Sequence, residues 1–178
     1  MQYISKYQSP MGEMTLASDG EALTGAWFEA QKYFASTLNK DVTEREVPVL
    51  ETVMEWLDRY FKGERPEIGE LPLVPAGSEF RQSVWKILCE IPYGEVITYG
   101  DIARRIAEEK GMERMSSQAV GGAVGHNPIS VIIPCHRVVG SNGSLTGYAG
   151  GIDLKVKLLQ HENADMSKLF VPKKGTAL

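Results

Sequence analysis

A β-branched run that ends at a proline constrains the fold of this chain more than any other feature. Residues 129–133 read Ile-Ser-Val-Ile-Ile, which is typical of a buried strand. Pro134 has no N–H for a central ladder, so the strand is expected to stop there. Cys135 and His136 follow directly, in a chain with 2 cysteines and 3 histidines. The pattern therefore predicts a cysteine beside a histidine where a sheet gives way to irregular chain.

The Cys-His pair supports two interpretations. A histidine near a thiol favours the thiolate, which is the nucleophilic form of cysteine. A free cysteine also packs often as a small buried hydrophobe, and a bare dipeptide does not separate the two cases. Because neighbours on a strand point to opposite faces, a water between Cys135 and His136 is expected rather than a direct bond.

Composition excludes several classes of protein. Cys89 and Cys135 are too few for a disulfide framework or a zinc site, so we expect reduced thiols, no metal and no cofactor. Residues 1–6 lack the apolar core of a signal peptide, and no apolar run approaches the length of a membrane helix. We therefore expect a cytoplasmic protein that does not contact membranes.

Charge divides the chain in two. Residues 1–75 carry 7 Lys and Arg and 13 Asp and Glu, a net charge of −6, whereas residues 76–178 carry 12 and 10, a net charge of +2. The overall net charge of −4 argues against a generic nucleic-acid binder. The C-terminal part can still bind DNA, through shape and backbone N–H groups more than through phosphate charge.

The first 77 residues predict a scaffold domain with a linker. Short apolar runs alternate with turn signals over the first thirty residues, which indicates an antiparallel meander. From Val47 the apolar positions take helical spacing, and Gly63 is expected to end that helix. Residues 65–77 are rich in Pro and Gly and are interpreted as the linker.

Residues 78–178 predict a second domain with a helix-turn-helix outline. Thr98 and Asp101 have the spacing of a capping box, and the helix that they open is expected to end near Gly111. A second helix over residues 118–126 follows a polar break. Helix, turn and helix in this order are typical of a DNA-binding motif, although proteins that bind no DNA share the outline.

The helix over residues 118–126 carries three glycines, each of which costs about 1 kcal/mol relative to alanine. Such a helix either packs tightly on a neighbour or approaches another molecule closely, and the sequence leaves both open. Asn127 before Pro128 is expected to end the helix and to bond to nearby backbone. A flexible loop around Tyr148, a last helix and a peripheral tail from Asn163 complete the chain.

The C-terminal part closely resembles one family, the O6-alkylguanine-DNA alkyltransferases (methylated-DNA–protein-cysteine methyltransferases). The resemblance covers Phe80 to Glu162. It rests on Ile133-Pro134-Cys135-His136-Arg137-Val138-Val139, Asn127-Pro128, Tyr93 to Tyr99, Ala119-Val120-Gly121-Gly122-Ala123, Gly147-Tyr148-Ala149-Gly150-Gly151 and Leu158 to Glu162. The implied fold class is α+β, with an N-terminal ribonuclease-H-like antiparallel sheet plus helix. A C-terminal winged-helix-like helix-turn-helix domain would carry the active cysteine.

The resemblance implies a suicide reaction. Members flip O6-alkylguanine out of duplex DNA and transfer its alkyl group irreversibly to a cysteine, and O4-alkylthymine is a further candidate lesion. By position, Cys135 resembles the acceptor and His136 the base that deprotonates it through a water. Glu162 resembles the carboxylate that orients His136. The implied partner is double-stranded DNA containing O6-alkylguanine, bound by a monomer.

The resemblance also implies a binding site for DNA and the damaged base. Tyr99 resembles the residue that helps rotate the target nucleotide, and Asn127 a hinge between the helix-turn-helix and the active-site loop. Tyr148 resembles a residue beside the guanine, with the backbone of Val138 and Ala149 reading its edge. The implied binding positions are Tyr99, Gly100, Gln118, Asn127, Val138, Ser141, Tyr148 and Ala149.

Gln118 departs from the family pattern. Members typically carry an arginine there, which enters the minor groove and contacts the orphaned base. Glutamine keeps hydrogen-bonding groups but loses the charge and the planar stack, and Arg114 in a longer turn is a candidate substitute. Two other functions stay open: an alkyltransferase-like lesion-binding protein with little transfer, and a Cys-His hydrolase of small substrates.

Overall fold

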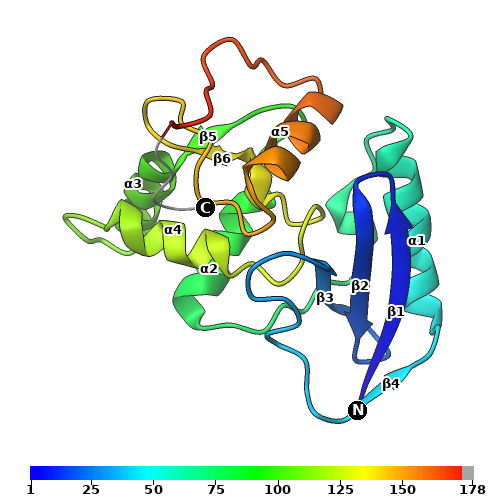
Figure 1. The fold of residues 1–178 in the computed structure, drawn as a ribbon. Helices are drawn as coiled ribbons and strands as arrows, with labels where there is room; N and C mark the ends of the chain where they lie inside the picture. The colour runs from blue at the N-terminus through cyan, green and yellow to red at the C-terminus, as the bar shows by residue number, and fades with distance from the viewer. Residues whose placement is uncertain (174–178) are drawn as a thin grey trace. The chain divides into compact units, whose positions relative to one another are not determined.

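The computed structural model describes residues 1–173 of the chain (Figure 1). Contacts within the chain define two compact units. The first contains Met1–Ala76 together with Pro128–Ile132, and the second contains Gly77–Asn127 and the chain from Ile133 onward. Residues 128–132, which the sequence assigns to the second domain, therefore belong to the first unit.

The sheet of the first unit is a meander with an additional edge strand. Strands β1 (Gln2–Ser9), β2 (Gly12–Ser18) and β3 (Leu23–Phe28) are antiparallel neighbours, as predicted. Strand β4 (Val42–Glu44) pairs with β1 in parallel, so the order is β3-β2-β1-β4 and the sheet is not purely antiparallel. A strand of three residues is too short to carry a recognisable alternation, which is why the sequence does not predict β4.

Helix α1 (Pro48–Phe61) packs against this sheet and lies close to its predicted position (Figure 1). Pro48 is in the first turn, where a missing N–H costs little. Leu50 and Val53 are completely buried along its inner side. Gly63 has φ 91° just past the helix end, which is the left-handed geometry that commonly stops a helix.

The expected linker is an ordered part of the first unit. It contains a short 3-10 helix, η1 (Ile68–Glu70), and then lies along β3. The carbonyl of Pro72 accepts from the N–H of Leu23 at 2.8 Å, and the N–H of Val74 donates to the carbonyl of Leu23 at 2.9 Å. A proline cannot donate in such a ladder but can accept, so a proline-rich segment can still pair at a sheet edge.

The prediction of a strand over residues 129–133 is wrong, although the prediction that these residues are buried is correct. The segment forms one bridge with β3, in which Ala26 donates to the carbonyl of Pro128 and accepts from Ser130, each at 2.8 Å. The chain then turns sharply at Val131, which has φ 71°. A hydrogen bond of 2.9 Å from the N–H of Ile132 to the carbonyl of Ser130 closes this turn. This three-residue bond and positive φ match a γ-turn, and hydrophobicity alone does not distinguish a buried turn from a buried strand.

Three of the four α-helices described in the second unit begin at a residue whose side chain caps the helix. The four are α2 (Glu79–Leu88), α3 (Tyr99–Glu109), α4 (Ser117–Gly125) and α5 (Ile152–His161). Thr98 and Asp101 form the predicted capping box, and Ser116 caps α4. Helices α3 and α4 pack against each other, and α2 contacts both. Strand β5 (Ile97–Thr98) runs parallel to β6 (Val138–Val139) beside the predicted cysteine site.

The tail expected to be peripheral is packed into the second unit as far as it is described. Leu145 donates to the carbonyl of Phe170 at 2.9 Å, and Phe170 donates to the carbonyl of Gly143 at 3.1 Å. Met166 and Leu169 cover a buried apolar cluster that includes Leu145. The last part of the tail, residues 174–178, lies outside the described residues.

Candidate active site

Cys135, His136 and Arg137 form a single turn of 3-10 helix, η2, between Pro134 and β6. Pro134 has φ −82° and ψ 66°, and the N–H of Cys135 donates back to the carbonyl of Ile133 at 2.8 Å. These values describe an inverse γ-turn, which leads the chain into η2. Cys135 was expected where a strand gives way to irregular chain, but it follows a turn and lies in this short helix, so the alternating strand geometry expected for Cys135 and His136 is wrong. The three side chains of η2 are buried, with exposed fractions of 4%, 0% and 6%.

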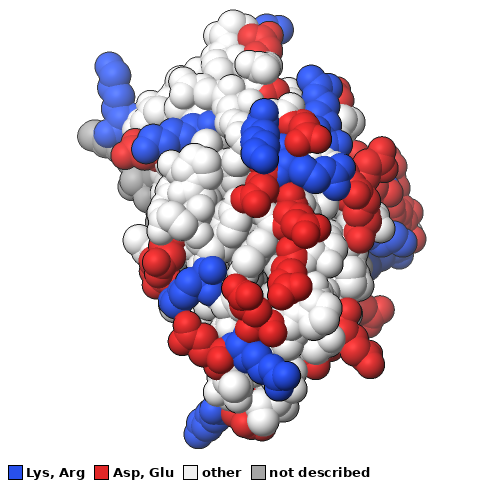
Figure 2. Space-filling view, turned by 90° about the vertical axis from the view of Figure 1, so that its right-hand side faces the viewer, with Lys and Arg blue, Asp and Glu red and all other residues white. Residues whose placement is uncertain are grey.

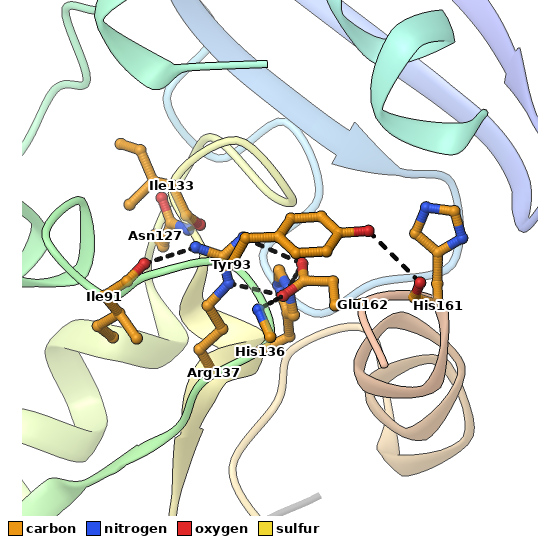
Figure 3. Close-up of polar contacts among 9 residues, drawn as sticks. Ile91, Tyr93, Asn127, Ile133, His136, Arg137, His161 and Glu162 are labelled. Carbon is orange, nitrogen blue, oxygen red and sulfur yellow. Dashed lines mark hydrogen bonds and ion pairs between the residues drawn. The ribbon is translucent and has the colours of Figure 1, made fainter. Parts of the chain in front are cut away.

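The imidazole of His136 lies directly against the carboxylate of Glu162 (Figure 3). The distance from Nε2 of His136 to Oε2 of Glu162 is 2.7 Å, and both side chains are completely enclosed. The N–H of Gly94 also donates to Glu162, at 3.1 Å. Burial favours the neutral acid, but hydrogen bonds and charge from His136 and Arg137 outweigh it and hold the pKa of Glu162 far below its usual range.

One ring nitrogen of His136, Nε2, is hydrogen-bonded to Glu162, and the other, Nδ1, has no hydrogen-bond partner among the described protein atoms. Nε2 faces an ionised carboxylate and so carries the proton when the ring is neutral. Burial lowers the pKa of His136, and the opposing effect of Glu162 does not restore it. The ring is therefore neutral near pH 7 and can accept a proton at Nδ1.

Cys135 is protonated at rest but surrounded by groups that favour its thiolate. Burial raises the pKa of the thiol, while the Asn127 side chain, the charge of Lys155 and two backbone N–H groups lower it. Asn127 also donates from Nδ2 to the carbonyl of Ile133 at 2.8 Å. Asn127 thus connects the end of α4 to the segment that leads into η2, as the resemblance implies for a hinge.

Lys155 also belongs to this site, a role that was not predicted from the sequence. Its side chain is completely buried on α5, and Nζ donates to the carbonyls of Val138 and Thr146. Burial lowers the pKa of Lys155 to about 8, and the neighbouring Cys135 opposes that shift. The available signal was its position three and four residues before Leu158 and Leu159, on the apolar side of the last helix.

Two tyrosines border the site. The hydroxyl of Tyr99 donates to the carbonyl of Thr146 at 2.8 Å, and burial raises the pKa of Tyr99. The ring of Tyr148 is 3% exposed and lies edge-on to His136, with 6.4 Å between the ring centroids. The loop around Tyr148 therefore holds its aromatic ring inside the second unit. The remaining implied positions differ in exposure: Val138 is buried, Gly100 and Ala149 are half-buried, and Ser141 is exposed.

Helix α4 presents an open surface of small side chains. Gln118 and Ala119 in its first turn are exposed. A Cβ added to Gly122 or Gly125 would meet no atom within 4 Å, and one added to Gly121 would come only within 3.9 Å of the ring of Tyr99. Close packing inside the protein therefore does not require these glycines. Of the two explanations left open by the sequence, close approach to another molecule fits this surface.

Comparison with known proteins agrees with this geometry. Residues 79–164 match the model of the 6-O-methylguanine DNA methyltransferase DNA-binding domain, and residues 2–75 match that of its ribonuclease-like domain. The chain belongs to the 6-O-methylguanine DNA methyltransferase family. Both the resemblance identified from the sequence and the α+β fold class are thereby confirmed.

Individual methyltransferases of the family match over most of their length. The methylated-DNA--protein-cysteine methyltransferase of Haemophilus influenzae is 44% identical over 160 residues, covering 90% of this chain and 86% of its own. That of Methanosarcina acetivorans is 42% identical, covering 91% and 99%. The crystal structure of Mycobacterium tuberculosis OGT in complex with DNA matches with a TM-score of 0.77 and 40% identity, covering 90% of this chain and 92% of that one. Among residues 1–173, no helix is both long and apolar enough to cross a membrane.

Proposed function

We propose that this protein repairs DNA by moving the alkyl group of O6-alkylguanine to Cys135, once per molecule, as a cytoplasmic monomer acting on double-stranded DNA. The observation that carries the proposal is the enclosed His136–Glu162 pair next to Cys135 in a chain of this family. The family relatives bear names that describe methyl transfer from DNA to a protein cysteine. O4-alkylthymine is a second candidate substrate.

The proposed reaction begins with a proton transfer. The thiol proton of Cys135 passes through a water to Nδ1 of His136, and the Nε2–H bond to Glu162 stabilises the resulting imidazolium. The positive charge of Lys155 favours the thiolate that remains. Neutral His136 and a thiol that is protonated at rest are the starting states that this step requires.

The alkyl transfer then consumes the protein. The sulfur of Cys135 forms a bond to the alkyl carbon as the bond from that carbon to O6 breaks, and the electron pair of the broken bond stays with guanine. Guanine takes up a proton, which balances the one held by His136. The product is a thioether at Cys135, which no group in the site can hydrolyse, so the protein acts in a single turnover.

DNA binding is proposed for the surface of α4. The exposed N-terminus of a helix offers backbone N–H groups and a partial positive charge to phosphates, and the open glycine face allows close approach. Acidic side chains gather over part of the face that Figure 2 draws, and such a surface repels phosphates. The target base has to leave the stack to reach a buried sulfur, which costs a few kcal/mol.

Intact-protein and peptide mass spectrometry test the proposal. After incubation with duplex DNA containing O6-methylguanine, the peptide with Cys135 should gain one methyl group per protein molecule. Mass gain on the Cys89 peptide alone, or none at all, would contradict the proposal. Binding to the damaged duplex with Cys135 unmodified after prolonged incubation would instead favour a lesion-binding protein, and repeated turnover on a thioester would favour a hydrolase.

A further inference from the structure

Arg137 is held at every nitrogen of its guanidinium group (Figure 3). Nε and Nη2 donate to the two carboxylate oxygens of Glu162, at 2.8 and 3.1 Å, and Nη1 donates to the carbonyl of Ile91 at 2.6 Å. The guanidinium carbon lies 5.7 Å from the ring centroid of Tyr93. An arginine fixed in this way places a permanent positive charge at one position inside the second unit.

Each carboxylate oxygen of Glu162 takes part in two hydrogen bonds. Oε1 accepts from Gly94 and from Nε of Arg137, and Oε2 accepts from His136 and from Nη2 of Arg137. Four hydrogen bonds match the four lone-pair sites of a carboxylate. Arg137 therefore fixes both the position of the carboxylate and the oxygen that remains for His136.

The charge of Arg137 also determines whether the neutral or the protonated form of His136 is more stable beside Glu162. A buried carboxylate requires a positive partner, and Arg137 already supplies one, so the Arg137–Glu162 pair is neutral without a proton on His136. With Arg137 absent, protonated His136 would become the remaining positively charged group in direct contact with Glu162. Imidazolium has no lone pair at Nδ1 and cannot accept the proton of a thiol.

The charged and titratable groups around His136 come from several elements. Arg137 and Cys135 lie on η2, Lys155 lies on α5, and Glu162 follows the end of α5. The ring of Tyr148 approaches from the loop before α5. Burial lowers the pKa of His136 most, Glu162 raises it, and the charges of Arg137 and Lys155 lower it. Arg137 is distinguished from Lys155 because it also binds Glu162 directly.

We propose that Arg137 is a positioning residue for alkyl transfer, which clamps Glu162 and keeps His136 neutral so that Nδ1 can accept the proton of Cys135. This inference rests on the proposed function, because it assigns Arg137 a part in that same proton transfer. If Arg137 acts in this way, its replacement should change the pH dependence of the transfer rate more than it changes the stability of the fold.

The experiment compares four variants with the wild type. Arg137→Gln removes the charge, Arg137→Lys keeps the charge but loses the fork, and Arg137→Gln combined with Glu162→Gln removes both charges. Arg105→Gln is the control, since Arg105 pairs with Glu90 and Glu109 at the exposed surface of the same unit. The rate of a single turnover with O6-benzylguanine as the free base is measured by intact mass from pH 5 to 9. Circular dichroism at each pH confirms folding.

The expected result is a shift of the acid limb of the rate profile. Arg137→Gln should move the limb at least one unit toward higher pH, so that the rate at pH 6 falls about tenfold more than the rate at pH 8.5. Arg137→Lys should recover much of this loss, and the double variant should return the limb to the wild-type position or below it. Arg105→Gln should leave the profile unchanged.

Two results would overturn the inference. A folded Arg137→Gln variant with an unshifted profile would make Arg137 merely structural, and so would a double variant whose acid limb stays as high as that of Arg137→Gln. If Arg137→Gln does not fold, the comparison of Arg137→Lys with the double variant decides in the same way. Failure of wild-type Cys135 to react with either O6-benzylguanine or methylated duplex would instead reject the proposed function itself.

Discussion

At Cys135, burial opposes the ionisation of the thiol that the proposed reaction requires, while several neighbouring groups favour it. Burial stabilises the thiol, whereas Asn127, Lys155 and two backbone N–H groups stabilise the thiolate. A buried thiol resists adventitious oxidation and alkylation because its thiolate population is small. Such a site is suited to a protein that can react only once, since any unintended reaction at Cys135 removes the molecule from use.

We predict that Cys135→Ala abolishes alkyl transfer and leaves the fold intact. Loss of one buried sulfur should lower the free energy of unfolding by about 1 kcal/mol. Mass spectrometry after incubation with methylated duplex measures transfer, and urea unfolding measures stability. Cys89→Ala is the matched control and should transfer normally. An unfolded Cys135→Ala protein would mean that the cysteine is structural.

A second prediction concerns the buried amine of Lys155. Its pKa is about 8 in the folded protein against 10.5 for a free lysine, so between these values the unfolded chain binds more protons. The free energy of unfolding should therefore rise with pH across this window of 2.5 units, by about 3.5 kcal/mol in total at about 1.4 kcal/mol per unit. Urea unfolding from pH 7.5 to 10.5 should show this rise for the wild type relative to Lys155→Met. Parallel curves for the two proteins would contradict a buried, titrating amine.

The residues of the site differ in how far the sequence could reveal them. The residue types and the family motif predict Cys135, His136 and Glu162 as a nucleophile, its base and the carboxylate behind the base. Arg137 lies in the same motif, but its role is not visible in the sequence because its bonds to Glu162 and Ile91 join segments far apart in the chain. The sequence does not predict the burial of Lys155, because lysine side chains are ordinarily exposed to solvent.

At the scale of elements, local signals predicted more than non-local ones did. The capping box of Thr98 and Asp101 acts within one turn of the helix that it begins, so its effect is visible in the sequence. Strand β4 and the bridge between Ala26 and residues 128–130 depend on pairing partners that are distant in sequence. The packing of residues 163–173 on the loop before α5 also depends on distant partners, so the expectation of a peripheral tail is wrong.

The glycine face of α4 leads to a third prediction. Because nothing lies within 4 Å of a Cβ at Gly122, Gly122→Ala should stabilise the free protein by about 1 kcal/mol through its higher helix propensity. The same methyl group should weaken binding to methylated duplex, which thermal unfolding and fluorescence anisotropy measure separately. Gly69→Ala, which adds a methyl to an equally open site in the first unit, is the control. Unchanged DNA affinity in Gly122→Ala would exclude this face from the contact.

At the scale of the whole molecule, Gln118 governs the fourth prediction. A neutral amide replaces the stacking cation typical of the family, so this protein should depend more on weakness already present in the duplex. Single-turnover rates should therefore favour a lesion at a mismatch or in single-stranded DNA over one in a perfect duplex, because flipping costs less there. Gln118→Arg should reduce that preference.

The free base O6-benzylguanine provides the control for Gln118, because it requires no flipping. Wild type and Gln118→Arg should react with it at equal rates. Equal context preference of the two proteins on DNA would contradict the prediction and direct attention to Arg114. Arg114→Ala would then be compared on the same substrates.

The return of the chain to β3 at residues 128–132 has a consequence for synthesis on the ribosome. The first unit is assembled from two stretches of chain, and the whole of residues 77–127 is made between them. Its sheet edge at Ala26 stays unpaired until Pro128 and Ser130 have emerged from the exit tunnel. The acidic N-terminal unit thus cannot finish folding until the complete helix-turn-helix has been translated.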